Sequence, residues 1–186
     1  EVMRDAVEKG TTGEGVESVT GYTGHDAAKL RDYNEKNHAL SGREMIEAVK
    51  GAVATNEVNA AMGIICATPT AGSSGTIPGV LFKLEKTHDL TEDQMVDFLF
   101  TSALFGRVVA NNASVAGATG GCQAEVGSAS AMAAAASVAI FKGTPEQSGH
   151  AMALAISNLL GLVCDPVAGL VEIPCVMRNA IGSGNA

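Results

Sequence analysis

The small size of its apolar side chains is the feature that most constrains how this chain can fold. The stretch Ala129–Ile140 contains seven alanines among its twelve residues, glycine occurs 22 times, and aromatic residues make up 4% with no Trp. Interiors of proteins are close-packed, so a core of such residues fills only where backbones approach one another. With 186 residues, 46% of them hydrophobic, the chain is long enough to form one domain with a real core.

Charge and hydropathy exclude several classes of partner. The net charge is −8 and the basic residues are scattered singly, which argues against a nucleic-acid surface. No apolar run is long enough for a bilayer span, and the charged first twenty residues do not resemble a signal peptide. Four cysteines in an acidic chain of this length do not suggest a disulfide framework. We therefore expect a cytoplasmic protein without a membrane partner.

Helix-start signals indicate a mainly α fold. Capping boxes at Ser41–Glu44 and Thr91–Gln94, and the Thr144-Pro145 pair, each predict a helix start. Further helices are expected near Asp26, over residues 123–141, and from about Pro174. The first box should open a helix reaching about Met62, with Met45 facing the core, and Leu104 should face it from the second. Residues 63–79 and the segment Val19–Asp26 are predicted as loops, and residues 1–40 as a whole are polar and only weakly periodic. The expected architecture is one all-helical domain over residues 1–186, cut at both ends, with long Gly/Pro-rich functional loops.

Three of the cysteines lie where loops could bring them together. Cys122 ends a glycine-dense segment at the mouth of a helix, and Cys164 and Cys175 bracket a loop that contains prolines and glycine. Three thiolates from such loops suit an iron–sulfur cluster, and would leave one iron of a 4Fe–4S cluster without a protein ligand. Their spacing matches no metal-binding motif, so burial as small hydrophobic residues stays open. Cys66, after two isoleucines, is expected to be a buried packing residue.

A polar loop and one arginine are candidates for substrate binding. The loop offers hydroxyls and glycines that allow close approach of a carboxylate, at Thr70, Gly72, Ser73, Ser74 and Gly75. Arg178 lies one helical turn beyond Cys175 and could bind a substrate carboxylate. An ordinary structured loop and a salt-bridged arginine are the alternatives.

The histidines give one candidate for proton transfer. His25 lies in a loop between Gly24 and Asp26, where it could serve as a base, although a solvated or capping role is also open. No pair of histidines has metal-binding spacing. The others, His38, His88 and His150, are expected on the surface.

Three sequence blocks resemble the iron–sulfur-dependent L-serine dehydratases, specifically their α chain or catalytic domain. These are Cys66–Gly75, Gly120–Ala129 and Gly161–Cys175. The resemblance implies an all-helical catalytic domain in which Cys122, Cys164 and Cys175 hold a 4Fe–4S cluster. It also implies a separate β chain or β domain, missing from this sequence, and an oligomeric enzyme made of identical or different chains.

The same resemblance implies a reaction in amino-acid degradation and gluconeogenesis. L-serine would be deaminated to pyruvate and ammonia without pyridoxal phosphate, with the open iron acting as Lewis acid on the substrate hydroxyl. The base that removes the α-proton is either His25 or a residue of the β portion. Alternatives are a related cluster lyase acting on cysteine or another small amino acid, a redox-sensing iron–sulfur domain, and a helical scaffold without cofactor.

Overall fold

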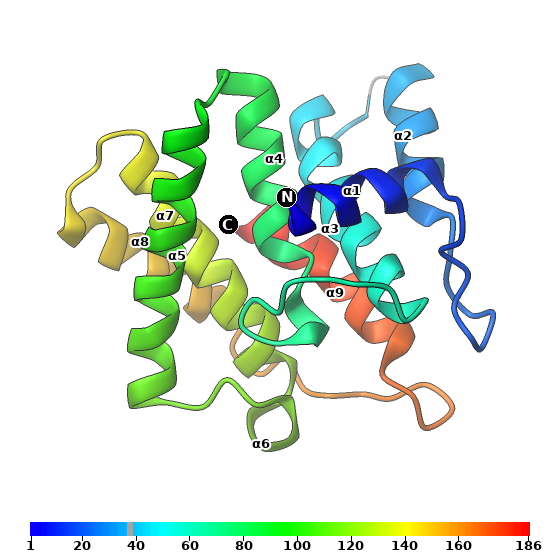
Figure 1. The fold of residues 1–186 in the computed structure, drawn as a ribbon. Coiled ribbons are helices and arrows are strands. Elements are labelled where there is room, and N and C mark those ends of the chain that lie inside the picture. The colour runs from blue at the N-terminus through cyan, green and yellow to red at the C-terminus, as the bar shows by residue number, and fades with distance from the viewer. Residues whose placement is uncertain (37–38) are drawn as a thin grey trace.

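A computed structural model describes residues 1–36 and 39–186, and these form a helical domain without β-strands (Figure 1). This confirms the mainly α expectation. His38, expected at the surface, lies outside the described residues. The α-helices are α1 Val2–Thr12, α2 Asp26–Lys36, α3 Arg43–Ala60, α4 Thr76–His88, α5 Glu92–Asn112, α6 Gly117–Cys122, α7 Ser128–Ile140, α8 Pro145–Asn158 and α9 Glu172–Asn185. A 3₁₀ turn, Ala71–Ser73, precedes α4, and a π-helical segment, Gln123–Gly127, joins α6 to α7.

Helix α3 is the central element, and α1, α2, α4 and α9 pack around it (Figure 1). Glycines let backbones touch at these crossings, as the composition predicted. A Cβ on Gly10 of α1 would lie 2.2 Å from the Ala54 carbonyl oxygen of α3. Gly51 of α3 and Gly79 of α4 face each other, with a Cβ on Gly51 only 3.1 Å from the Gly79 Cα. The close approach replaces the large side chains that the sequence lacks.

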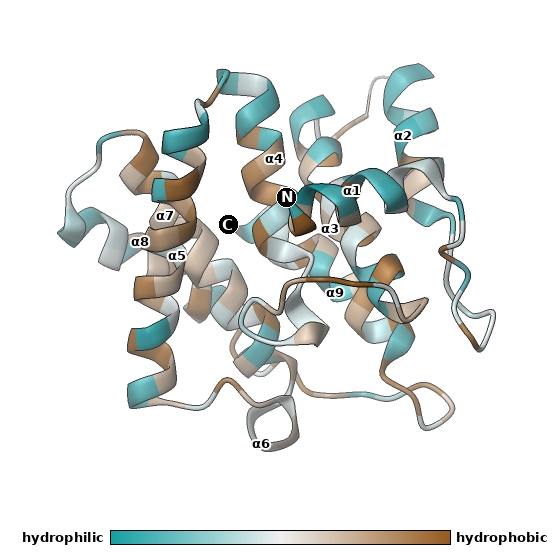
Figure 2. Ribbon diagram, in the orientation of Figure 1, coloured by the Kyte–Doolittle hydropathy of each residue, from teal (hydrophilic) through white to brown (hydrophobic). Residues whose placement is uncertain are grey.

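A second group of helices is built on α7, which packs between α5 and α8. The alanines of α7 are buried along most of the helix, and Figure 2 shows hydrophobic residues throughout it, whereas α1 and α2 are mostly hydrophilic. Larger side chains, among them Phe98, Ile77, Leu81 and Met132, fill the space between α4, α5 and α7. None of the described helices is both long and apolar enough to cross a lipid bilayer.

Two of the three predicted capping boxes form. The Thr91 and Thr144 hydroxyls accept hydrogen bonds from the third backbone N–H of α5 and α8, as predicted. The box predicted at Ser41 is wrong, because Gly42 is the N-cap of α3 and makes no side-chain cap bond. The Glu44 carboxylate instead pairs with Lys83 of α4, 2.9 Å away. A long-range ion pair has replaced the local cap.

Helix α1 lies in a segment for which no helix was predicted, and the first turn of α4 lies in the predicted loop 63–79. The buried residues of α1 are two small ones, Ala6 and Gly10. Pro78 suggested a loop, but it sits in the first turn of α4, where a backbone N–H is not needed. Two side chains expected in the core are exposed instead: Met45 by 39%, where it lies near Gly184 of α9, and Leu104 by 62%.

Candidate active site

Cys122 lies at a sharp corner between α6 and the π-helical segment. Gly121 makes the corner with φ 68 and ψ −166, and a Cβ there would lie 3.1 Å from the Cys164 backbone nitrogen. The Gln123 N–H donates to the Leu162 carbonyl at 2.8 Å, and the Gln123 side-chain oxygen accepts from the Gly161 N–H at 2.7 Å. The loop after α8 therefore runs directly along the Cys122 corner (Figure 1).

Arg178 of α9 joins this corner to the loop. Its Nη1 donates to Cys122 Sγ at 3.1 Å and to the Val163 carbonyl at 2.8 Å, and its Nη2 pairs with the Asp165 carboxylate. The guanidinium thus already holds a carboxylate of the protein. The structure places Arg178 beside Cys122, and its predicted binding of a substrate carboxylate stays a prediction.

Cys175 lies in the first turn of α9, buried under Gly72, where a Gly72 Cβ would lie 3.4 Å from its Sγ. Burial, together with the nearby charges of Cys122, Glu125 and Cys164, raises the pKa of Cys175 to about 12. Burial also raises the pKa of Cys122, while Arg178 acts to lower it. The Cys164 backbone nitrogen lies against Gly121, next to Cys122, and Arg178, which lies one turn beyond Cys175 on α9, donates to Cys122 Sγ. Cys164 is exposed, whereas Cys122 and Cys175 are buried.

Most polar groups of the predicted substrate loop make hydrogen bonds within the protein. Ser73 and Ser74 are completely buried; the Ser73 hydroxyl donates to the Thr68 carbonyl at 3.0 Å, and the Ser74 hydroxyl accepts from the Asn56 amide at 3.3 Å. Gly75 packs on α3, where a Cβ would lie 2.1 Å from the Ala52 carbonyl oxygen. Of the predicted residues, only Thr70 and Gly72 lie near the thiols.

Asn179 fixes this loop to α9. Its amide nitrogen donates to the Gly72 and Cys175 carbonyls, both at 2.7 Å. Its amide oxygen accepts from the Gly75 N–H at 3.0 Å and the Thr76 hydroxyl at 3.1 Å. The side chain is 0% exposed, so all four bonds are made away from water. Sequence analysis missed Asn179, since one asparagine in a helix carries no signal of such long-range contacts.

A hollow of about 440 Å³ opens beside Cys175. Its walls come from α3, the 3₁₀ turn, the π-helical segment and the start of α9, and the residues are Asn56, Asn59, Ala60, Met62, Ala71, Gly72, Glu125, Leu170, Val171, Glu172 and Cys175. Glu125 is held there by the Thr70 hydroxyl, which donates to its Oε1 at 2.6 Å. Sequence analysis missed Glu125 as well; its place three residues after Cys122 was the available signal.

Glu172 lines the opposite part of this hollow and holds the segment before α2. The Thr20 and Thr23 hydroxyls donate to its two oxygens, both at 2.6 Å. Burial alone would raise the pKa of Glu172, but the hydroxyls outweigh it, so the pKa lies below its ordinary value. His25 follows this segment with φ 66, and its Nε2 lies 3.2 Å from Glu17. The structure therefore does not bring His25 into the hollow.

Cys66 lies apart from the other thiols. It lines a groove of about 840 Å³ between the N-terminal residues, α4 and α5. The expectation of a buried packing residue is wrong, because Cys66 is partly exposed.

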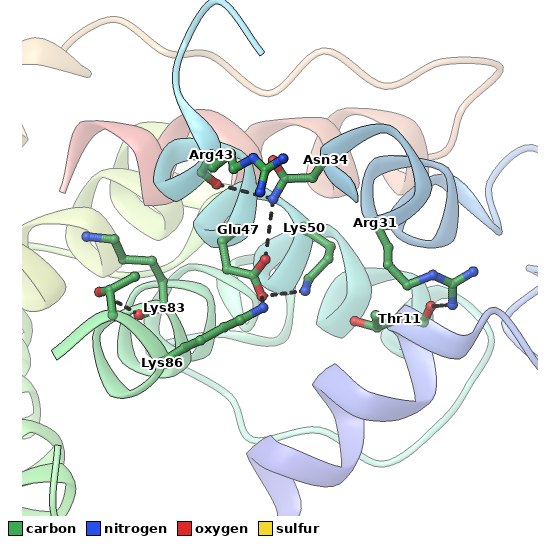
Figure 3. Close-up of polar contacts among 9 residues, drawn as sticks. Thr11, Arg31, Asn34, Arg43, Glu47, Lys50, Lys83 and Lys86 are labelled. Atoms are coloured by element: carbon green, nitrogen blue, oxygen red, sulfur yellow. Dashed lines mark hydrogen bonds and ion pairs between the residues drawn. The ribbon is translucent and has the colours of Figure 1, made fainter. Parts of the chain in front are cut away.

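A second polar hollow, of about 310 Å³, lies at the ends of α2 and α4 and the start of α3 (Figure 3). Its charged groups already neutralise one another. Glu47 accepts hydrogen bonds from both Lys50 and Lys86, and the Asn34 amide nitrogen lies 3.5 Å from the same carboxylate (Figure 3). None of the three clustered thiols lines it, so the hollow beside Cys175 is the candidate active site.

The side chains near that site that could bind a metal cluster are the thiols of Cys122, Cys164 and Cys175. Among the described residues no three His, Cys, Asp or Glu side chains are spaced to hold a single metal ion. An iron–sulfur cluster is wider than one ion, and its ligands stand correspondingly further apart. Three thiols in one region, two of them buried and one beside an arginine that offsets thiolate charge, fit the requirements of a cluster.

Comparison with known proteins identifies the family of this chain. The profile of the family described as "Serine dehydratase alpha chain" matches residues 1–186. The chain is 63% identical over 185 residues to "Probable L-serine dehydratase, alpha chain" of Bacillus subtilis, covering 100% of this chain and 61% of that protein. It is 48% identical over 170 residues to "L-serine dehydratase, alpha chain" of Peptoniphilus asaccharolyticus, covering 90% and 58%. It is 36% identical over 190 residues to "L-serine dehydratase 2" of Escherichia coli, covering 100% and 42%. This chain belongs to the serine dehydratase alpha chain family.

Proposed function

We propose that this chain provides the catalytic site of an enzyme that converts L-serine to pyruvate and ammonia. The carrying observation is that Arg178 contacts both Cys122 and the Cys164 loop, and lies one turn along α9 from Cys175, which lines the hollow. Family membership supports the substrate, because the relatives are named L-serine dehydratases. The chain spans 61% of the Bacillus subtilis relative, so we propose that a β chain or β domain completes the enzyme, as an oligomer in the cytoplasm.

We propose Cys122, Cys164 and Cys175 as ligands of a 4Fe–4S cluster. When bound, the cluster would supply an iron without a protein ligand, a Lewis acid for the substrate hydroxyl. Arg178 offsets negative charge at Cys122 and holds the Cys164 loop close to it. Exposure of Cys164 leaves a route by which a cluster could enter, while the other two thiols are already fixed in place by burial.

The chain's own residues would prepare the substrate for elimination. Removal of the α-proton and departure of the β-hydroxyl as water give aminoacrylate, which tautomerises to the imine and is hydrolysed to pyruvate and ammonia. His25 lies against Glu17, outside the hollow, so we propose that the β portion supplies the base.

Anaerobic reconstitution with iron and sulfide tests this proposal on the complete enzyme, that is, the full-length α chain with its β chain. We expect a brown protein that forms pyruvate from L-serine, and loss of both properties on Cys→Ser substitution at position 122, 164 or 175. Cys66→Ala is the matched control, since Cys66 lines a different groove, and it should keep both colour and activity.

Each of the other outcomes of this experiment would favour one of the alternative functions. Loss of the cluster with Cys66→Ala would mean a four-ligand redox domain, and a brown enzyme without activity would remove the dehydratase. A colourless protein under anaerobic conditions would indicate a scaffold. Preference for L-cysteine in a panel of small amino acids would make it a related lyase.

A further inference from the structure

Glu125 lines the hollow beside Cys175, and only one of its two carboxylate oxygens has a hydrogen-bond partner among the described residues. Its Oε1 accepts from the Thr70 hydroxyl at 2.6 Å. Within the described chain, Oε2 receives no hydrogen bond and no Lys, Arg or His pairs with Glu125. A half-buried carboxylate without a cationic partner is costly unless water or a ligand satisfies it, so Oε2 is the open position of this group.

Two glycines shape the space around this carboxylate. A Cβ on Gly117 would lie 2.3 Å from Oε2, and a Cβ on Gly72 would lie 3.2 Å from Oε1. The same Gly72 Cβ would lie 3.4 Å from Cys175 Sγ. Glu125 and Cys175 therefore flank a single glycine, and the carboxylate lies next to a proposed cluster ligand.

The walls of the hollow are negative. Glu125 and Glu172 are its charged residues, and no Lys or Arg is among the described residues that line it. Glu172 differs from Glu125 because both of its oxygens accept hydroxyl hydrogen bonds, at 2.6 Å each. A cationic group entering the hollow would thus find its unsatisfied acceptor at Glu125.

We propose that Glu125 binds the α-ammonium group of the amino-acid substrate through Oε2. The inference rests on the proposed function, and it extends that function by naming the group that selects an amine. In serine the ammonium and the hydroxyl are carried by adjacent carbons, so their binding sites must be neighbours, as Glu125 and Cys175 are. Thr70 is the positioning residue, because its hydroxyl orients the carboxylate.

The test compares a substrate with its amine-free counterpart in the reconstituted complete enzyme. L-serine is used as the substrate, and 3-hydroxypropanoate, which is serine without the amino group, is added as the competing ligand. Glu125→Gln should raise KM for L-serine about 10- to 100-fold, the usual effect of losing a charged hydrogen bond. The inhibition constant of 3-hydroxypropanoate should change less than about threefold, since that molecule has no ammonium.

Two further variants separate binding from structure. Glu172→Gln removes the other carboxylate of the hollow and should leave the ratio of the two constants as in the wild type. Glu125→Asp keeps the charge and should restore part of the preference for L-serine. Circular dichroism and iron content establish that each variant is folded and loaded.

Equal weakening of both ligands by Glu125→Gln would overturn the inference, because it would show a merely structural role. An unchanged KM would do the same. A wild-type enzyme that forms no pyruvate would overturn the proposed function instead. In that case calorimetric titration of the protein with the same two ligands still decides on Glu125, and equal affinities would reject it.

Discussion

Nη1 of Arg178 donates a hydrogen bond to Cys122 Sγ at 3.1 Å and a second to the Val163 carbonyl at 2.8 Å. One side chain on α9 thus connects a thiol on the α6 corner with the loop that carries Cys164. The bonds join parts of the chain 56 and 15 residues away from Arg178, so the arrangement exists only in the folded protein.

Arg178→Met should weaken retention of an iron–sulfur cluster. The variant keeps much of the side-chain volume but loses the charge and all three of the arginine's contacts, including the ion pair with Asp165. Loss of a residue that orients a metal ligand commonly lowers metal affinity about 10- to 100-fold. Iron content after a timed challenge with a chelator measures the effect. Arg107→Met, on the exposed face of α5, is the control and should retain iron as the wild type does.

Asn179→Leu should lower the free energy of unfolding by about 3 kcal/mol or more, because several buried polar groups lose their partner at once. The groups left unpaired include the Gly72 carbonyl and the Gly75 N–H. Urea denaturation gives the free energy. Asn112→Ala, which removes an exposed bond to the Val108 carbonyl, should cost less than about 0.5 kcal/mol. Similar losses in the two variants would contradict the bridging role of Asn179.

Two glycine-to-alanine substitutions should have opposite effects on stability. Gly149→Ala in α8 meets nothing within 4 Å and should stabilise the protein by up to about 1 kcal/mol, since alanine favours helix. Gly10→Ala in α1 places a methyl group 2.2 Å from the Ala54 carbonyl oxygen and should destabilise it by about 1–3 kcal/mol. Thermal unfolding of both variants checks the pair. If Gly10→Ala were neutral, the close approach of α1 and α3 would be wrong.

Acid unfolding should depend on Glu47 (Figure 3). Burial raises the pKa of Glu47, but Lys50 and Lys86 outweigh it, so the folded-state pKa lies below its ordinary value of 4.5. A lowered carboxyl pKa stabilises the fold above the ordinary value, and this stabilisation is lost as the pH falls through the folded-state pKa.

Glu47→Gln should therefore lower the free energy of unfolding at pH 7 by about 1–3 kcal/mol, because Lys50 stays buried without its partner. Its stability should also fall less steeply than that of the wild type below about pH 4.5. Urea denaturation across a pH series measures both. An acid limb as steep as that of the wild type would reject the role of Glu47.

The sequence was sufficient for those parts of the fold whose signals are local. The Thr91 and Thr144 capping boxes involve residues three apart, and both formed. Helix α1 escaped prediction because its buried face consists of Ala6 and Gly10, whose importance appears only when α3 lies against them. The capping box predicted at Ser41 does not form for a related reason, since the Glu44 carboxylate makes an ion pair with Lys83 on another helix.

The candidate site divides in the same way. The sequence blocks around the cysteines predicted a region for the site, but not the contacts that organise that region. Ser73 and Ser74 looked available as hydroxyls in a loop, yet folding buries them completely. Glu125 meets Thr70 across 55 residues of sequence, a relationship that no local pattern reveals.

The four hydrogen bonds of Asn179 also have a mechanical consequence. The Asn179 amide makes hydrogen bonds to Gly72 and Gly75 in the loop and to the Cys175 carbonyl in its own helix. These bonds should make α9 and the 72–75 loop move as a rigid unit. A displacement of α9 by a neighbouring chain or domain would therefore also displace Gly72. The glycine that separates Cys175 from Glu125 is therefore expected to move together with α9, a helix of 14 residues.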